Sequence, residues 1–361
     1  MDYDPIILDE AYNRLHKTGP EFRGWLSNHG PMAVEAMFRR GQGDVVQRWL
    51  DRYMRRLEPV PPVTGPIGDD WHHALGDVRR AADWTRYFED ILTEQPWQMT
   101  LNTWWRRLLP GIAAGATHGV IRVGHAVRAL LTDGASPIRV RELAHGLAYW
   151  AARWKPITIP QDFWNPGTRD DSARALPTVW STFASLPRLT GPDNAGGFDA
   201  WASRMDELPG WTEVVYGIRI PDNPEQIPLW LAQVVDTAVV RYLWYGHGDA
   251  IMLVHSATAP NAVWRVLPAL DKRWWRLSAL AAWIATATLT AIYASGPPAD
   301  PSVLRPFSTS RHAAEEAFAR AVAHGDEHVI KFADTAVDVY ARTRDPQALA
   351  AIDRAAALIK L

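Results

Sequence analysis

The stretch Asp326-Glu327-His328-Val329-Ile330-Lys331-Phe332-Ala333-Asp334-Thr335-Ala336 predicts a helix that packs against a core. Its apolar residues recur at i, i+3, i+4 and i+7, the spacing of a helix with one apolar face: Val329, Phe332, Ala333 and Ala336. His328 and Lys331 are three residues apart, so their side chains are neighbours along the edge of that face. Burial disfavours the charged form of both side chains, which makes this pair unusual in a core.

Lysine is rare in this chain, and its rarity draws attention to Lys331. Only five lysines occur among 38 basic residues, so arginine is used wherever a positive charge is sufficient. A guanidinium stays protonated in proteins, whereas a buried lysine can become neutral and act as a nucleophile or bind carbon dioxide as a carbamate. The alternative is a lysine whose stem lies on apolar surface and whose ammonium reaches water.

The composition is that of a globular protein, and it excludes several kinds of site. Hydrophobic residues make up 47% and charged residues 22% of 361 residues, enough for one large or two ordinary domains. A net charge of −2 gives no electrostatic reason to expect nucleic acid or an anionic membrane as partner. Because cysteine is absent, disulfides, thiolate metal sites and cysteine nucleophiles are excluded.

No pattern indicates secretion or a membrane span. Residues 1–10 lack a basic segment followed by an apolar one, and the apolar run 279–294 is shorter than the roughly 20 residues that cross a bilayer. We therefore expect a cytoplasmic protein without membrane contact. The 19 tryptophans are expected mostly in the core, with some lining a pocket for a flat aromatic ligand.

Helical patterns dominate the rest of the chain, and the only strand candidate is 214–220. Between residues 156 and 228 prolines, glycines and short polar clusters predict an irregular lid or insert that sets substrate choice. We therefore predict an all-α fold, a single large helical domain (1–361) with a loop-rich middle segment. Besides the opening stretch, the expected helices are 9–16, 31–38, 44–57, 70–93, 97–109, 112–131, 140–154, 229–245, 251–270, 272–293, 310–324 and 346–361.

Common catalytic signatures are missing, and histidines on helices remain. The chain has no G-x-G-x-x-G after a strand, no P-loop, no G-x-S-x-G and no H-E-x-x-H. A lone buried histidine is usually a satisfied core residue, but several unpaired imidazoles each cost about 1–3 kcal/mol, which a shared metal ion would offset. Sequence spacing does not show whether they converge. Histidines at apolar helix positions are His29, His118, His125, His255 and His328.

Three segments resemble the questin oxidase-like family, the anthraquinone ring-opening enzymes of polyketide pathways. They are Asn28-His29-Gly30-Pro31-Met32-Ala33, Thr117-His118-Gly119-Val120-Ile121-Arg122 and Glu327-His328-Val329-Ile330-Lys331-Phe332. They occur in the family's order, and Val254-His255-Ser256-Ala257-Thr258 resembles a further histidine block between them. The resemblance spans roughly residues 28–335.

The resemblance implies a mononuclear non-haem iron site, held by histidines and a carboxylated lysine. The implied ligands are His29, His118, His255, His328 and Lys331. The block around His255 matches most loosely, so His247 is a substitute candidate. A carbamate would convert Lys331 into a long carboxylate, an anionic oxygen ligand suited to Fe(II).

Two further residues lie at i+4 and i+7 from His118 and are the candidate catalytic residues. Arg122 would orient a phenolate or carboxylate of the substrate; the alternative is an ion pair with a neighbouring acid. His125 would support the metal ligands; the alternative is a core position. Glu142 and His145 form the only copy of a Glu-x-x-His pattern, too little for a di-iron cage.

The function implied is an Fe(II)-dependent oxygenase acting on an aromatic polyketide, an anthraquinone-like polycycle, with dioxygen as co-substrate. It would cleave a carbon–carbon bond or insert oxygen in a Baeyer–Villiger manner, with NADPH as a reductant if one is needed, because no dinucleotide fold is readable. Two alternatives stay open: a helical carrier of a planar hydrophobe, and a metal-dependent hydrolase with a carbamylated lysine. Metal content distinguishes the three.

Overall fold

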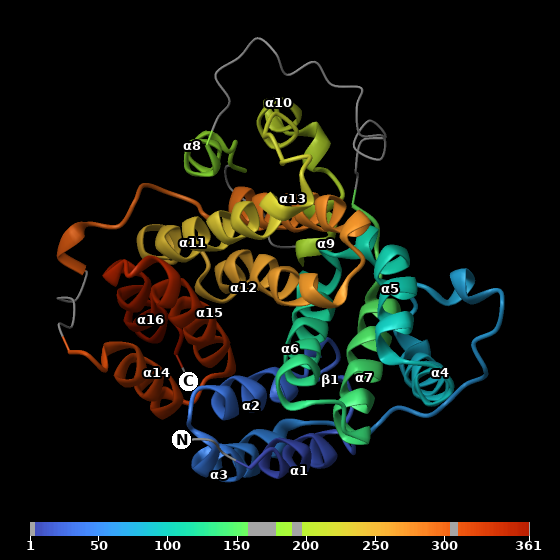
Figure 1. Cartoon of the computed structure of the whole chain (residues 1–361). Coiled ribbons are helices and arrows are strands. Elements are labelled where there is room, and N and C mark those ends of the chain that lie inside the picture. Colours follow the sequence, from blue (N-terminus) through green and yellow to red (C-terminus); the bar gives the residue numbers. More distant parts are fainter. Residues whose placement is uncertain (1–3, 158–177, 190–196, 304–309, 361) are drawn as a thin grey trace.

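The computed structural model describes residues 4–157, 178–189, 197–303 and 310–360, and within them the chain is almost entirely helical (Figure 1). The predicted all-α class is confirmed. The only sheet among these residues is a two-stranded antiparallel one, β1 (Glu21–Phe22) paired with β2 (Leu26–Ser27). The one strand candidate, 214–220, forms no strand, because Val214 and Val215 end helix α10.

Four helices from distant parts of the chain form the centre of the molecule. Each packs against two of the others in a closed cycle: α2 on α6, α6 on α12, α12 on α15, and α15 on α2 (Figure 1). A four-membered cycle of this kind encloses a short interior into which all four helices can direct side chains. The four are α2 (Gly30–Arg39), α6 (His118–Asp133), α12 (Ala250–Val266) and α15 (Glu327–Thr343).

The remaining helices cover these four. Helix α7 packs on α6 and also contacts α4, while α11 and α13 pack on α12. Helices α14 and α16 pack on α15, and helices α1 and α3 pack on α2. The longer ones are α1 (Ile6–Leu15), α3 (Gly43–Tyr53), α4 (Ala81–Glu94), α5 (Trp97–Leu108), α7 (Pro137–Arg153), α11 (Ile227–Tyr245), α13 (Trp275–Tyr293), α14 (Ala313–His324) and α16 (Pro346–Leu358).

Helices α6 and α12 approach each other closely because one contact position is glycine. A Cβ placed on Gly124 would lie 2.6 Å from the Cβ of Ala262 and 2.7 Å from its Cα. Only glycine opposite a small residue permits this spacing of the two backbones. The histidines of the two helices are thereby brought within reach of one another.

The predicted continuous helix 112–131 was wrong, because the backbone breaks just before His118. Gly115, Ala116 and Thr117 have φ values of 55°, 52° and 68°, in the left-handed region. This conformation is unusual for alanine and threonine and costs of the order of 1–3 kcal/mol per residue. Helix α6 therefore begins at His118, and the strain lies directly beside a candidate metal ligand.

Pro260 lies inside the continuous helix α12. Proline lacks an N–H, so the carbonyl four residues earlier, that of Ser256, loses its usual partner. The hydroxyl of Thr286 on α13 donates a hydrogen bond to that carbonyl at 3.1 Å. A residue of the neighbouring helix thus satisfies the interrupted hydrogen-bond ladder.

The predicted helix 70–93 was wrong in its first half, where short 3-10 turns at Trp71–Ala74 and Val78–Arg80 precede α4. Most other expected helices are present with ends shifted by a few residues, as is usual for helix termini. The middle segment contains α8 (Val179–Ser185), α9 (Gly197–Ala202) and α10 (Trp211–Val215).

Residues 158–177 and 190–196, which include Trp164, lie outside the described residues. The role of the middle segment as a lid or insert therefore stays a prediction, as does the single-domain assignment. Lys272–Tyr293 is the one helix in the described part of the chain long and apolar enough to cross a membrane, and 89% of its apolar window is buried inside the protein. This matches the expected buried helix.

Candidate metal centre

The imidazoles of His29, His118, His255 and His328 meet at the centre of the four-helix cycle. One ring nitrogen from each lies within 4.8 Å of the other three. The Nε2 atom of His118 is 2.8 Å from Nε2 of His29 and 3.0 Å from Nε2 of His255. We call these four residues the histidine cluster. Each comes from a different helix or its cap, so only the folded chain brings them together.

The four rings form a closed cycle of edge-to-face contacts. The ring centroids of His29 and His118 are 4.6 Å apart, those of His118 and His255 4.5 Å, those of His255 and His328 5.8 Å, and those of His328 and His29 4.4 Å. These contacts hold the four rings together, with one ring nitrogen of each within 4.8 Å of the others.

The strained turn before α6 fixes the tautomer of His118. The carbonyl of Gly115 is 2.5 Å from Nδ1 of His118, so that Nδ1 carries the proton and donates it. The lone pair then resides on Nε2, the atom that faces His29 and His255. A ligating histidine is commonly oriented in this manner, through its other ring nitrogen.

Caps place two more of these histidines. His29 is the N-cap of α2, and its backbone N–H donates to the hydroxyl of Tyr53 at 2.6 Å. The cap of α15, Asp326, accepts the backbone N–H of His328 at 2.8 Å and lies 3.3 Å from its Nδ1. That second contact orients the ring of His328 and leaves its other nitrogen for the interior.

Burial keeps three of the imidazoles neutral. It lowers the pKa of His29, His118 and His255 well below the ordinary value, and the positive charge of Lys331 lowers the pKa of each further. Neutral imidazole is the form that binds a metal. His29, His118 and His255 are therefore in their ligand form at neutral pH.

Lys331 is fully buried, at 0% exposure, and its Nζ has no hydrogen-bond partner among the described residues. The alternative of an ammonium in water is therefore wrong. Burial lowers the pKa of Lys331 to about 7, although the charges of Glu327 and Asp326 act to raise it. Burial therefore favours the neutral amine of Lys331.

The donor set fits a transition-metal ion. Two ring nitrogens bound at right angles to one ion about 2.1 Å away would be about 3.0 Å apart, close to the observed 2.8 and 3.0 Å. Imidazole suits iron, zinc, copper and nickel alike, so these distances do not choose among them. Within the described chain no carboxylate belongs to the group of four histidines, although Asp326 and Glu327 form a separate group with His328. The buried, unpartnered Lys331 could provide an anionic oxygen as a carbamate.

Comparison with known proteins identifies the family of this chain. The model of the questin oxidase-like family matches residues 26–336, most of the chain. The chain belongs to the questin oxidase-like family. A search of curated proteins finds no match. Family membership indicates an oxidase or oxygenase of polyketide pathways that acts on a small molecule, an oxidoreductase in general terms.

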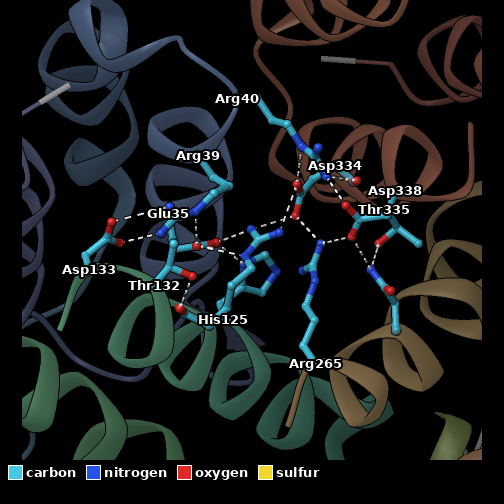
Figure 2. A network of polar contacts seen from close by, with 12 residues as sticks. Glu35, Arg39, Arg40, His125, Thr132, Asp133, Arg265, Asp334, Thr335 and Asp338 are labelled. Atoms are coloured by element: carbon cyan, nitrogen blue, oxygen red, sulfur yellow. Dashed lines mark hydrogen bonds and ion pairs between the residues drawn. The ribbon is translucent and has the colours of Figure 1, made fainter. Parts of the chain in front are cut away.

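In this questin oxidase-like chain a buried charge network lies beyond the histidine cluster and connects the same four helices (Figure 2). Asp334 of α15 accepts hydrogen bonds from Arg40 at the end of α2, Arg128 of α6 and Arg265 of α12. Arg128 also donates to Glu35 of α2. We call this set the charge network; it further includes His125, Arg39, Asp133, Thr335 and Asp338.

His125 lies in the charge network and not in the histidine cluster. Its Nδ1 is 2.7 Å from a carboxylate oxygen of Glu35. Burial lowers the pKa of His125, although Glu35 acts to raise it. These contacts indicate that His125 supports the helices around the candidate metal ligands. A catalytic role for His125 stays a prediction.

Arg122 forms a two-pronged ion pair with Glu142, at 2.6 and 3.0 Å. Glu142 also accepts from His16 at 2.9 Å, and all three side chains are buried. The structure therefore shows the alternative interpretation of Arg122, an ion pair with a neighbouring acid. His145 lies 3.3 Å from Glu89, away from any metal-like cluster. A substrate-orienting role for Arg122 stays a prediction.

The substitute ligand His247 lies on an exposed turn after α11 and is outside the histidine cluster. His255, in contrast, is a member of the histidine cluster, and its role as a ligand stays a prediction. Sequence reasoning missed the charge network, although one signal was present: charged residues occur at positions flanked by apolar or small neighbours. Glu35 lies between Val34 and Ala36, and Asp334 follows Ala333.

Proposed function

We propose that the chain is a non-haem iron-dependent oxygenase that cleaves, or inserts oxygen into, a ring of an anthraquinone-like aromatic polyketide. The observation that supports it most is the meeting of four buried imidazoles beside a buried lysine without a partner. Family membership supports the oxidoreductase class and a small-molecule substrate. The iron and the substrate are parts of the proposal.

In this proposal His29, His118, His255 and His328 hold the Fe(II), and Lys331 provides an anionic oxygen as a carbamate. The neutral amine attacks the carbon of CO2, an N–C bond forms, one proton is released to water, and a carboxylate results. A lysine with a pKa of about 7 has the neutral amine available without a separate base. The bound iron would supply the electron-transfer chemistry that makes dioxygen reactive toward the ring.

The surrounding protein has three tasks in this chemistry. The caps and the strained turn orient the imidazoles, the charge network holds the four helices, and the apolar core keeps water from the site. Inserting one oxygen atom reduces the other atom of O2 to water and needs two electrons, which NADPH would supply. A ring cleavage that uses both atoms needs no reductant. Oxygen uptake with and without NADPH separates these two reactions.

Metal analysis of protein purified without added metal tests the proposal. The expected result is iron near one equivalent, together with oxygen uptake in the presence of an anthraquinone that metal-free protein does not show. Zinc or nickel in place of iron would instead support a hydrolase with a carbamylated lysine. Protein that folds, binds the polycycle and contains no metal would be a carrier, and the oxygenase proposal would then be rejected.

A further inference from the structure

Tryptophan rings lie in a row that begins behind helix α6 and extends through α7 and α5 toward α4. The row begins at Trp150 of α7, which packs against the residue that follows His118. A Cβ placed on Gly119 would lie 2.6 Å from the Cβ of Trp150 and 2.8 Å from its Cγ. Trp150 is therefore in direct contact with the helical turn that carries one candidate metal ligand.

Three further rings continue from Trp150 to the surface. The ring centroids of Trp150 and Trp105 are 5.3 Å apart, and those of Trp104 and Tyr87 are 5.5 Å apart. Trp104 and Trp105 are consecutive residues of α5, so one peptide unit joins the two pairs. The three tryptophans are at most 1% exposed, whereas Tyr87 of α4 is half-buried. We call Trp150, Trp105, Trp104 and Tyr87 the aromatic row.

Core packing alone would also place rings side by side, so the groups around the rings decide what the row can do. The indole N–H of Trp150 donates to the carbonyl of Gly111 at 3.1 Å, and that of Trp105 to the hydroxyl of Ser278 at 2.8 Å. Neither acceptor is a base that takes the proton of an oxidised indole. An indole that loses an electron here stays a cation, which is costly in an apolar core. It therefore regains an electron from the next ring.

A fixed positive charge determines where this electron transfer ends. The Cζ of Arg107 lies 4.6 Å over the ring of Trp104 and 4.6 Å over that of Trp71. A guanidinium attracts a neutral indole but repels an indole cation. Tyrosine differs, because an oxidised tyrosine loses its hydroxyl proton and becomes neutral. Tyr87 is half-buried, so water can accept that proton. The electron is therefore expected to come from Tyr87.

We propose that the aromatic row carries single electrons from Tyr87 to the metal centre when the iron reacts with dioxygen or peroxide and no polyketide is bound. This protective function rests on the proposed iron site. In each event the oxidant at the iron gains one electron, and Tyr87 loses that electron and gives its hydroxyl proton to water. A thiol in solution then restores Tyr87 by transferring one hydrogen atom.

The residues near the histidine cluster explain why such a path is useful. The chain has no cysteine, the side chain that oxidants otherwise attack first. Met32 and Met37 lie on α2, the helix that His29 caps, and they are 1% and 0% exposed. Oxidation to the sulfoxide would place a polar group in this core and disrupt its packing. Transfer of the damage to Tyr87 at the surface would preserve both methionines.

Electron paramagnetic resonance tests the row in iron-loaded protein that is frozen after hydrogen peroxide is added without substrate. We expect a tyrosyl radical in the wild-type protein and a signal at least tenfold weaker in Tyr87→Phe and in Trp105→Phe. Two controls should leave the signal unchanged. Trp283→Phe changes a buried tryptophan whose ring contacts Phe183, and Tyr340→Phe changes a half-buried tyrosine of α15.

Mass spectrometry of the digested samples gives a second readout that does not depend on turnover. Met32 and Met37 should be oxidised in Trp105→Phe and remain intact in the wild-type protein. A tyrosyl signal that persists in Tyr87→Phe would overturn the proposal, as would a wild-type protein that holds iron and forms no such radical. Either result would leave the oxygenase proposal unaffected. If Trp105→Phe does not fold, the half-buried Tyr87 provides the deciding variant.

Metal-free protein separates the row from the proposed function. Azide radicals produced by pulse radiolysis oxidise tryptophan directly, and we expect the absorption of the tryptophanyl radical to decay while that of the tyrosyl radical rises. This transfer should be at least tenfold slower in Tyr87→Phe. Such transfer in a protein that never binds iron would keep the electron path and reject the oxygenase. Equal transfer in the wild-type protein and in Tyr87→Phe would overturn the row.

Discussion

Lys331 and Asp334 lie one helical turn apart on α15 and have opposite surroundings. The carboxylate of Asp334 accepts hydrogen bonds from arginines of three other helical segments, while the ammonium of Lys331 has no partner among the described residues. Burial alone lowers the pKa of Lys331, while the carboxylates of Glu327 and Asp326 act to raise it. The acids of the charge network are paired with arginines, and none of them is a hydrogen-bond partner of Lys331.

Replacing Lys331 tests the carbamate. Lys331→Met keeps the length of the buried chain but cannot bind CO2, so we expect iron content to fall at least tenfold and turnover to be lost. Lys331→Arg keeps a positive charge and cannot be carbamylated either, and the same loss is expected. Metal analysis and mass spectrometry of the intact protein, with and without bicarbonate, are the measurements.

Lys360, at the exposed C-terminal end of the described chain, provides the control Lys360→Met, which should leave iron content unchanged. Because a buried arginine could unfold the core, circular dichroism and urea titration accompany the Lys331→Arg measurement. A Lys331→Met protein with full iron and full turnover would remove the carbamate from the proposal, though not the histidine ligands.

The sequence predicts the helices that carry the site. It does not predict that the four histidine side chains meet. The periodicity of 326–336 and the capping residues Asp249 and Asp326 are local signals, and they predict helices because each acts within one turn. The meeting of four histidines depends on close crossings such as Gly124 against Ala262, which join residues far apart in the chain. Only the family resemblance proposed the ligand set in advance.

The strained turn before His118 was also hidden from sequence reasoning. Gly115 alone suggests flexibility, but Ala116 and Thr117 have no preference for the left-handed region that they adopt. Tertiary packing imposes this conformation, so local propensity alone wrongly predicted a continuous helix. The carbonyl of Gly115 that fixes the tautomer of His118 is a product of this break.

Asp334→Asn tests the charge network. The change leaves Arg40, Arg128 and Arg265 buried without their common acid, and breaking a buried ion pair typically costs about 3–5 kcal/mol. We expect a loss of this size in the free energy of unfolding, measured with urea. Asp353→Asn is the control, because Asp353 pairs with the half-exposed Arg320 and such pairs contribute about 0–1 kcal/mol.

If Asp334→Asn does not accumulate as folded protein, Asp338→Asn is measured in its place, since Asp338 is at the partly exposed edge of the network. Losses of similar size for Asp338→Asn and Asp353→Asn would show that the network contributes no more than a surface ion pair. The support that we ascribe to it around the histidine cluster would then be withdrawn.

Stability toward acid should depend on Glu142. Burial acts to raise its pKa, but the charge of Arg122 and the contact with His16 outweigh it and lower the pKa to about 2. A depressed carboxylate pKa means that the unfolded state binds more protons, so this contribution is complete above about pH 4.5 and is lost as the pH falls toward 2. The difference between a pKa of 4.5 and one of about 2 corresponds to roughly 3 kcal/mol.

The measurement compares urea unfolding of the wild-type protein and of Glu142→Gln between pH 7 and pH 2. Other acids titrate in both proteins, so the difference in their free energies of unfolding isolates Glu142. We expect the difference to be largest near neutral pH and to shrink below about pH 4.5. A difference that stays constant over this range would contradict a lowered pKa at this position.

The hydrogen bond from Thr286 to the carbonyl of Ser256 should stabilise α12 at Pro260. Thr286→Val has nearly the same shape but cannot donate, which leaves a buried carbonyl without a partner at a cost of about 1–3 kcal/mol. Thr290→Val is the matched control on the same helix, because the hydroxyl of Thr290 donates to a carbonyl of its own helix. We expect the free energy of unfolding to fall by at least 1 kcal/mol more in Thr286→Val than in the control.

Since Ser256 follows His255, iron content should fall in Thr286→Val alone. Equal stability and equal iron in the two variants would show that Pro260 needs no support from α13.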